Sequence, residues 1–177
     1  MAVTGTDHLK AKVRDVPDWP EKGVIFRDIM PLLADADALK ETIDLLGDWA
    51  GERRPDVVVG GEARGFFIGS AIAYKLGCGW VPARRPGKLP LETIGIEYAL
   101  EYGMNTLELQ ADAFRGGSRV IIHDDVLATG GTSKAMAELV EQLGGDVVGI
   151  QFIIELDFLN GREKLADYDV FSLIHYE

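Results

Sequence analysis

The feature that most limits how this chain can fold is the alternation of short apolar runs with longer amphipathic segments. The short runs show little polar alternation, which fits strands that are covered on both faces of a sheet. The longer segments carry apolar residues three or four positions apart, as helices with one buried face do. The predicted strands are 55–61, 78–85, 120–125, 147–156 and 170–176, and the predicted helices are 36–52, 64–77 and 132–145. Strands that alternate with helices predict an α/β fold, with a doubly wound, mainly parallel sheet flanked by helices.

The length and the charge of the chain limit its domain organisation and its partners. Its 177 residues fit a single domain, 1–177. A net charge of −11 argues against non-specific nucleic-acid binding. No apolar run reaches the roughly 20 residues that cross a membrane, and residues 1–16 lack the apolar core of a signal peptide, so we predict a cytoplasmic protein with no membrane partner. Because Cys78 is the single cysteine, an internal disulfide and a cysteine-cluster metal site are excluded.

The alternating pattern fails between Gly87 and Ala113. This stretch is too long for a simple turn and mixes Glu, Tyr, Gly and Asn with apolar residues. Long connections of this kind in compact domains usually serve function, and we predict a functional loop here, built as an extended hairpin.

The chemistry of the chain is concentrated in VIIHDDVLATGGTSKAM (120–136), where two acids and a glycine-rich turn follow an apolar strand. Successive backbone N–H groups between Ala128 and Thr132, with a helix N-terminus behind them, suit an anion. The turn lacks the Gly-Lys-Ser/Thr of triphosphate loops and the spacing of dinucleotide sites, which favours a single phosphate monoester. Asp124 and Asp125 suit the vicinal hydroxyls of a ribose, and Mg2+ would offset the repulsion between their charges and the phosphate. A sugar phosphate fits both features; the alternative is a helix cap with a tight turn.

The same motif resembles the phosphoribosyl-pyrophosphate motif of the type I phosphoribosyltransferases. Five other segments are similar to the adenine branch of that family: VPDWPEKGVIFRDIMPLL, GGEARGF, VPARRPGKLP, LEYGMNTLEL and NGREKL. The resemblance implies a small N-terminal hood at about 16–34 and a mobile lid at about 88–113. It implies transfer of the 5-phosphoribosyl group from phosphoribosyl pyrophosphate to adenine, giving AMP and pyrophosphate. It also implies a homodimer, and Mg2+ held mainly by substrate and water, with no direct ligand expected from the protein.

The resemblance assigns the anionic parts of the substrate to two loops. The phosphoribosyl-binding residues that it implies are Asp124, Asp125, Ala128, Thr129, Gly130, Gly131 and Thr132. The pyrophosphate-binding residues that it implies are Glu62, Ala63, Arg64, Arg84 and Lys88. Arg84 and Lys88 belong to a basic cluster that is otherwise a solvated loop. Because the corresponding loop of the family often carries a cis peptide without proline, we predict one at Glu62–Ala63.

The resemblance also implies which residues bind the purine base and which residue transfers a proton. The adenine-binding residues that it implies are Ile25, Phe26, Arg27 and Leu156. Phe26 would stack on the purine, while backbone groups around Ile25 and Arg27 would pair with its edge and so separate adenine from 6-oxopurines. In the lid, Glu101 would handle the proton at the purine ring and Tyr102 would help to close the site.

Several positions depart from the pattern of the family. Trp19 stands where Phe is usual, Met30 where Thr or Ser is usual, and His123 interrupts an otherwise apolar strand. The stretch TIGIEYALEYG (93–103) replaces a more polar segment of the lid. Two alternatives stay open from the sequence, a phosphoribosyltransferase for another purine base and a non-catalytic relative that senses nucleotides.

Overall fold

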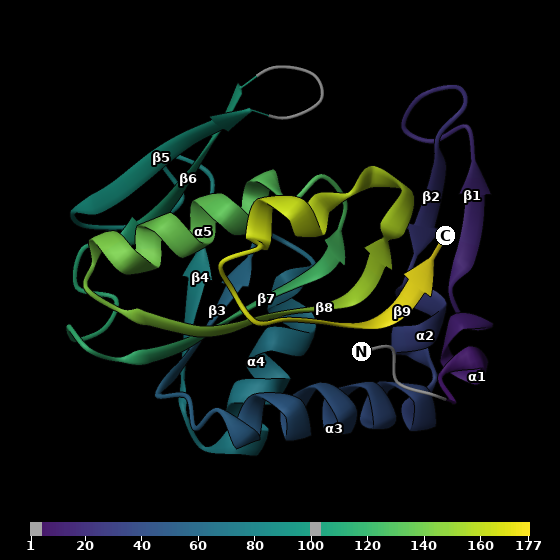
Figure 1. Ribbon diagram of the computed structural model, residues 1–177, viewed down its shortest axis with the longest axis horizontal. Helices are drawn as coiled ribbons and strands as arrows, with labels where there is room; N and C mark the ends of the chain where they lie inside the picture. Colours follow the sequence, from purple (N-terminus) through teal and green to yellow (C-terminus); the bar gives the residue numbers. More distant parts are fainter. Residues whose placement is uncertain (1–4, 100–103) are drawn as a thin grey trace.

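The computed structural model describes residues 5–99 and 104–177, and its centre is a parallel sheet (Figure 1). Within these residues the sheet has five strands in the order β4-β3-β7-β8-β9, and every neighbouring pair is parallel. The strands are β3 (Val57–Gly61), β4 (Gly79–Ala83), β7 (Arg119–Leu127), β8 (Asp146–Leu156) and β9 (Val170–Tyr176). The doubly wound, parallel fold predicted from the alternating pattern is therefore confirmed.

Helices cover both faces of this sheet (Figure 1). On one face lie α3 (Ala36–Glu52) and α4 (Gly65–Leu76), whose buried Leu46 and Ile72 share a core with Ile121 of the sheet. Asp35 caps α3 by accepting a hydrogen bond from the Ala38 N–H at 3.0 Å, and this fixes where the helix begins.

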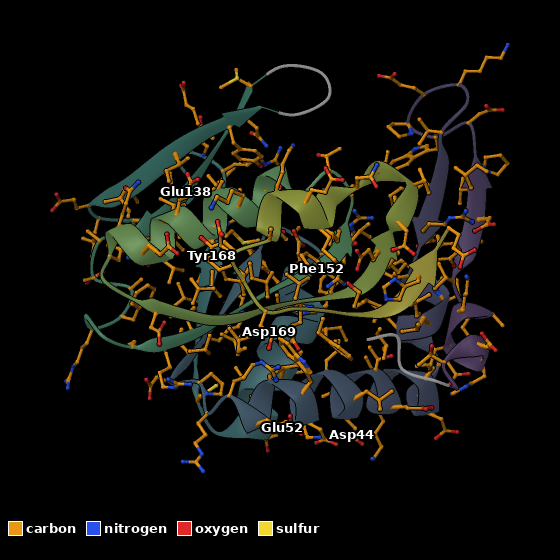
Figure 2. All side chains as sticks on the ribbon, in the orientation of Figure 1. Asp44, Glu52, Glu138, Phe152, Tyr168 and Asp169 are labelled. Carbon is orange, nitrogen blue, oxygen red and sulfur yellow. The ribbon has the colours of Figure 1, made fainter. Side chains whose placement is uncertain are left out.

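On the other face lies α5 (Gly131–Gln142), whose Met136 and Leu139 pack with Ile122 and Phe152. Phe152 is fully buried and lies near the centre of the molecule in Figure 2. The two cores hold the sheet between them, so the ends of its strands have fixed positions.

Strand β7 is longer than the sequence predicted. The expected strand ended at Asp125, but Val126 and Leu127 continue the ladder by pairing with β8. The misplaced boundary has a physical reason, because charged residues seldom occupy a buried strand and two adjacent acids therefore predict its end. The acids are thus held by the ladder itself and not by a free turn.

Two antiparallel ribbons rise on the side toward which the sheet strands point (Figure 1). One pairs β1 (Arg14–Pro17) with β2 (Ile25–Asp28), between the short helices α1 (Asp7–Lys10) and α2 (Met30–Ala34). The other pairs β5 (Thr93–Ala99) with β6 (Met104–Gln110), so the hairpin expected between residues 87 and 113 is present. Two 3-10 turns, η1 (Asp157–Leu159) and η2 (Gly161–Leu165), connect β8 to β9. Among the helices of the described residues, none is long and apolar enough to cross a membrane.

Candidate active site

A cavity of about 400 Å³ lies at the carboxyl ends of the sheet strands, between the two ribbons. This is where ligands bind in open parallel sheets, because the loops that follow the strands converge there. Of the predicted site residues, the cavity is lined by Ile25, Phe26, Arg27, Glu62, Arg64, Asp124, Asp125, Ala128, Thr132 and Leu156. The fold therefore brings together residues from both ends of the chain.

The acid pair lies on the floor of the cavity. Asp125 is only 4% exposed, and its own backbone N–H donates to Asp124 Oδ1 at 2.9 Å. Burial and the charge of the neighbouring Asp125 raise the pKa of Asp124 well above its ordinary value. Burial also raises the pKa of Asp125, although Arg64 acts in the opposite direction. Two crowded, desolvated carboxylates are strong hydrogen-bond acceptors, and they gain most from donors such as hydroxyl groups or from a cation.

The loop GGEARG between β3 and α4 is shaped around Asp124. A Cβ atom at Gly61 would lie 2.8 Å from Asp124 Oδ2, and one at Gly65 would lie 2.9 Å from Asp124 Oδ1. Since neither distance is compatible with a side chain, both glycines are required for the loop to approach the acid. The Glu62–Ala63 peptide bond is cis, which confirms the geometric prediction made from the sequence.

Arg64, the residue immediately before α4, connects the acid pair to the base side of the cavity. Its Nε lies 2.8 Å from Asp125 Oδ2, and its guanidinium lies 4.8 Å from the centre of the Phe26 ring. This ion pair offsets the charge of the Asp125 carboxylate, which would otherwise be buried without a counter-charge. Arg64 thus lies between the position expected for a ribose and the position expected for a base.

The base side of the cavity is built by β2. Phe26 meets the ring of Trp19 edge to face, with centroids 4.3 Å apart, so the substitution at position 19 supplies a wider aromatic support. The Arg27 side chain forms an ion pair with Asp15 and lies 4.0 Å over the Tyr176 ring. These two contacts hold the side chain of Arg27, which also lines the cavity, and backbone groups of this strand can meet a ligand beside it.

The turn after β7 forms a second, smaller cavity of about 110 Å³. We call residues 128–132 the phosphate loop. All five of its residues line this cavity together with Asp124, and α5 begins at Gly131. Gly130 has a φ of 77°, a left-handed conformation that favours glycine. The partial positive charge of a helix N-terminus and the open turn together suit a phosphate group.

The basic loop after β4 is arranged differently from the prediction. Arg84 donates to Glu62 at 3.2 Å and to the Lys88 carbonyl at 3.1 Å, and the exposed Lys88 side chain does not line the cavity. Although burial pushes it upward, the pKa of Glu62 is lowered, because the Arg85 backbone N–H and the Arg84 guanidinium stabilise the carboxylate. Arg85, which the sequence analysis did not select, lines the cavity instead.

The β5–β6 hairpin contributes side chains that the sequence analysis also missed. Tyr98 lines the cavity, and its hydroxyl lies 3.3 Å from Thr132 Oγ1 and 3.1 Å from Asn105 Nδ2. The only signal in the sequence was the position of Tyr98 in the unusual segment 93–103. The proposed catalytic pair, Glu101 and Tyr102, lies outside the described residues.

The site joins a parallel sheet, two adjacent acids at the end of a strand and a glycine-rich turn that suits an anion. The comparison with known protein families shows which class of enzymes has this arrangement. The family model described as phosphoribosyl transferase domain matches residues 28–175, which include the central sheet except Tyr176, the last residue of β9. The fold and the site thus define the class as phosphoribosyltransferase.

Individual relatives narrow this class. The adenine phosphoribosyltransferase of Geobacter metallireducens is 54% identical over 96% of this chain and 99% of its own length. The crystal structure of adenine phosphoribosyltransferase from Thermoanaerobacter pseudethanolicus superimposes with a TM-score of 0.94, at 50% identity, covering 96% of this chain and 99% of the other. The Saccharomyces cerevisiae enzyme, complexed with an imino-altritol bisphosphate and adenine, gives a TM-score of 0.90 at 40% identity, covering 94% and 97%. The chain belongs to the adenine phosphoribosyltransferase family.

Proposed function

We propose that this protein transfers the 5-phosphoribosyl group of phosphoribosyl pyrophosphate to adenine, giving AMP and pyrophosphate in purine salvage. The observation that carries the proposal is the junction of two cavities at Asp124, one suited to a phosphate and one bounded by an aromatic ring. A nucleoside monophosphate has the matching order of groups: phosphate, ribose and base. The presence of adenine in the related yeast structure supports the choice of base.

Recognition of adenine is assigned to β2 and the end of β8. Phe26 would stack on the purine, with Trp19 behind it and Leu156 on the other side of the cavity. The backbone around Ile25 and Arg27 would pair with the purine edge. A base with an oxygen at position 6 exchanges a donor for an acceptor, which leaves buried groups unpaired and costs roughly 1–3 kcal/mol for each.

The sugar and its phosphate are assigned to the end of β7. Asp124 and Asp125 would accept hydrogen bonds from the ribose hydroxyls, and the phosphate loop would hold the 5′-phosphate through its backbone N–H groups. The buried carboxylate oxygens are hard donors, and this chemistry fits Mg2+ bound to the sugar diphosphate. When bound, Mg2+ would neutralise charge on the diphosphate, while Asp124 and Asp125 would hold the ribose hydroxyls.

In the reaction, the C1′–O bond to pyrophosphate breaks and its electron pair leaves with pyrophosphate. A bond then forms between C1′ and N9 of adenine, and the proton on N9 passes to Glu101. Arg64 and Arg85, which both line the cavity, would stabilise the departing charge. Tyr102 and the β5–β6 hairpin would act as a lid that excludes water from the cationic transition state.

Incubation with phosphoribosyl pyrophosphate, Mg2+ and each purine base in turn tests the proposal. We expect AMP from adenine and far slower turnover of hypoxanthine and guanine. Comparable turnover of hypoxanthine would refute the choice of base. Nucleotide binding without turnover of any base would indicate a sensor.

Two further predictions from the sequence concern assembly and location. We propose a homodimer, since an exposed apolar groove that includes Met30, Phe66 and Phe67 offers a surface for a second copy. Sedimentation equilibrium tests this, and a monomer at micromolar concentration would refute it. The cytoplasmic location stays a prediction, which a fluorescent fusion would test.

A further inference from the structure

The segment NGREKL (160–165) has no part in the chemistry above, although its Gly161 touches the phosphate loop. A Cβ atom at Gly161 would lie 2.1 Å from the Ala128 carbonyl oxygen and 3.0 Å from the Gly130 nitrogen. A Cβ atom at Gly130 would in turn lie 2.4 Å from the Gly161 carbonyl oxygen. The two backbones are therefore in direct contact, and neither residue has room for a side chain.

Arg162 fixes this segment to the sheet. Its Nε and Nη2 donate to the two carboxylate oxygens of Glu155 at 2.9 and 2.5 Å, and its Nη1 donates to the Val170 carbonyl at 2.9 Å. Glu155 is only 5% exposed and belongs to β8, whereas Val170 begins β9. Arg162 thus ties the turn to the ends of two neighbouring strands with a two-pronged contact that only arginine provides.

The far end of the segment is held by α5. Leu165 is fully buried and packs in the same core as Met136 of that helix. Tyr168, which lies beside α5 in Figure 2, donates from its hydroxyl to Glu141 at 2.8 Å. The segment is therefore anchored on the sheet and on the helix that starts in the phosphate loop.

Glu155 also lies near Asp157 and His175, and these three side chains are close enough together to share a cation. Both oxygens of Glu155, however, already accept hydrogen bonds from Arg162. The cluster is therefore better explained as an ion-pair network that orients Arg162, with His175 Nδ1 2.9 Å from Asp157.

We propose that Gly161 and Arg162 are positioning residues for the 5′-phosphate. Gly161 supports the phosphate loop through backbone contacts without lining its cavity, and Arg162 keeps Gly161 in contact with Ala128 and Gly130. The inference rests on the proposed function, because it assigns the 5′-phosphate of phosphoribosyl pyrophosphate to this loop. A small shift of the loop would misalign several N–H donors at once, without moving the residues that bind adenine.

The test uses Gly161→Ala and Arg162→Gln in the full chain. Each variant is expected to raise the KM for phosphoribosyl pyrophosphate about tenfold or more, because shifts of about 1 Å in positioning groups have effects of this size. The KM for adenine is expected to stay within about twofold of the wild-type value, since no residue of the segment 160–165 lines the larger cavity. Arg162→Lys should recover only part of the loss, because it keeps the charge but not the fork.

Two control variants separate positioning from general destabilisation. Gly149→Ala places a Cβ atom 2.6 Å from Trp49 Cη2, away from the cavity. Arg53→Gln breaks a comparable contact, in which arginine donates to Asp169 at 3.1 Å and to the Trp49 carbonyl at 2.6 Å. Both controls should lower the melting temperature and leave the two KM values unchanged.

An unchanged KM for phosphoribosyl pyrophosphate in Arg162→Gln, or an equal rise in the control variants, would overturn the inference. If Gly161→Ala does not fold, the KM of Arg162→Gln for phosphoribosyl pyrophosphate is sufficient to test the inference. Affinity for ribose 5-phosphate, measured by calorimetry, separates the two proposals. If the wild type makes no AMP, the proposed function fails, and the affinities of the variants for ribose 5-phosphate then decide whether Gly161 and Arg162 position a phosphate.

Discussion

His123 makes the stability of the protein depend on pH in a way that one substitution should remove. The ring is fully buried on β7, and neither of its nitrogens has a partner among the described residues. Burial lowers the pKa of His123 from 6.5 to about 3. Between these two values the unfolded chain binds a proton that the folded chain does not, so stability falls as the pH falls from 6.5 toward 3.

The size of the effect follows from the lowered pKa. One pKa unit corresponds to about 1.36 kcal/mol, and pH 5 lies about 1.5 units below the ordinary pKa of histidine. Because only the unfolded chain protonates His123, the free energy of unfolding is lowered by about 2 kcal/mol at pH 5 and by close to zero at pH 7. His123→Leu removes the titrating group. The free energy of unfolding of the variant minus that of the wild type should therefore be about 2 kcal/mol larger at pH 5 than at pH 7.

Urea unfolding at pH 5, 6 and 7 measures this difference. Gln151→Leu is a matched control, because Gln151 is the β8 partner of His123 in the ladder, is fully buried, and also has an unpaired side chain. Since glutamine does not titrate, the control should change stability by the same amount at every pH. Asp124 and Asp125, whose raised pKa values act in the opposite direction, are present in all three proteins and cancel in the comparison. Parallel curves of stability against pH for the wild type and His123→Leu would refute the reasoning.

Three further predictions concern the site. The double variant Asp124→Asn, Asp125→Asn should weaken binding of phosphoribosyl pyrophosphate roughly 100-fold or more, since it weakens two hydrogen bonds to charged groups that contribute about 1.5–3 kcal/mol each; wild-type affinity by calorimetry would remove the acids from the site. Glu101→Gln should lower kcat far more than it lowers affinity for phosphoribosyl pyrophosphate, because proton transfer follows binding; a change in affinity alone, by single-turnover kinetics, would contradict the proton role. Tyr98→Phe removes the hydroxyl beside Thr132 Oγ1 and should raise the KM for phosphoribosyl pyrophosphate about 2- to 10-fold, which corresponds to one hydrogen bond; an unchanged KM would mean that the contact has no effect on binding.

The sequence predicted the central sheet and its helices well, because periodicity and glycine positions are local signals. The spacing of Asp124 and residues 128–132 also predicts that they lie together, and they line one cavity. Their binding of a sugar phosphate stays a prediction. The boundary of β7 was wrong by two residues because the ladder with β8 continues past the acids. The end of β7 depends on its pairing with β8, and local composition does not encode pairing between strands that are distant in the sequence.

The choice among neighbouring basic residues could not be made from the sequence. Arg84 and Arg85 are adjacent and chemically equal, yet only Arg85 lines the cavity. Both side chains pair with Glu62, but only Arg84 also forms a backbone bridge with Glu108 of the hairpin and donates to the Lys88 carbonyl. Tyr98 was missed for the same kind of reason, since its contact with Thr132 depends on how the hairpin lies against the phosphate loop.

The contact between Arg27 of β2 and Tyr176 of β9 has a consequence for the order in which the protein assembles during synthesis. Strand β2 leaves the ribosome early, but the Tyr176 ring, over which the Arg27 guanidinium lies at 4.0 Å in the folded protein, is at the other end of the chain. A nascent chain that ends near residue 142 already contains the phosphate loop and both acids, yet lacks β8, Leu156 and β9. Ribosome-bound intermediates of that length should therefore bind no nucleotide, and the pocket should form late, when the last two strands join the sheet.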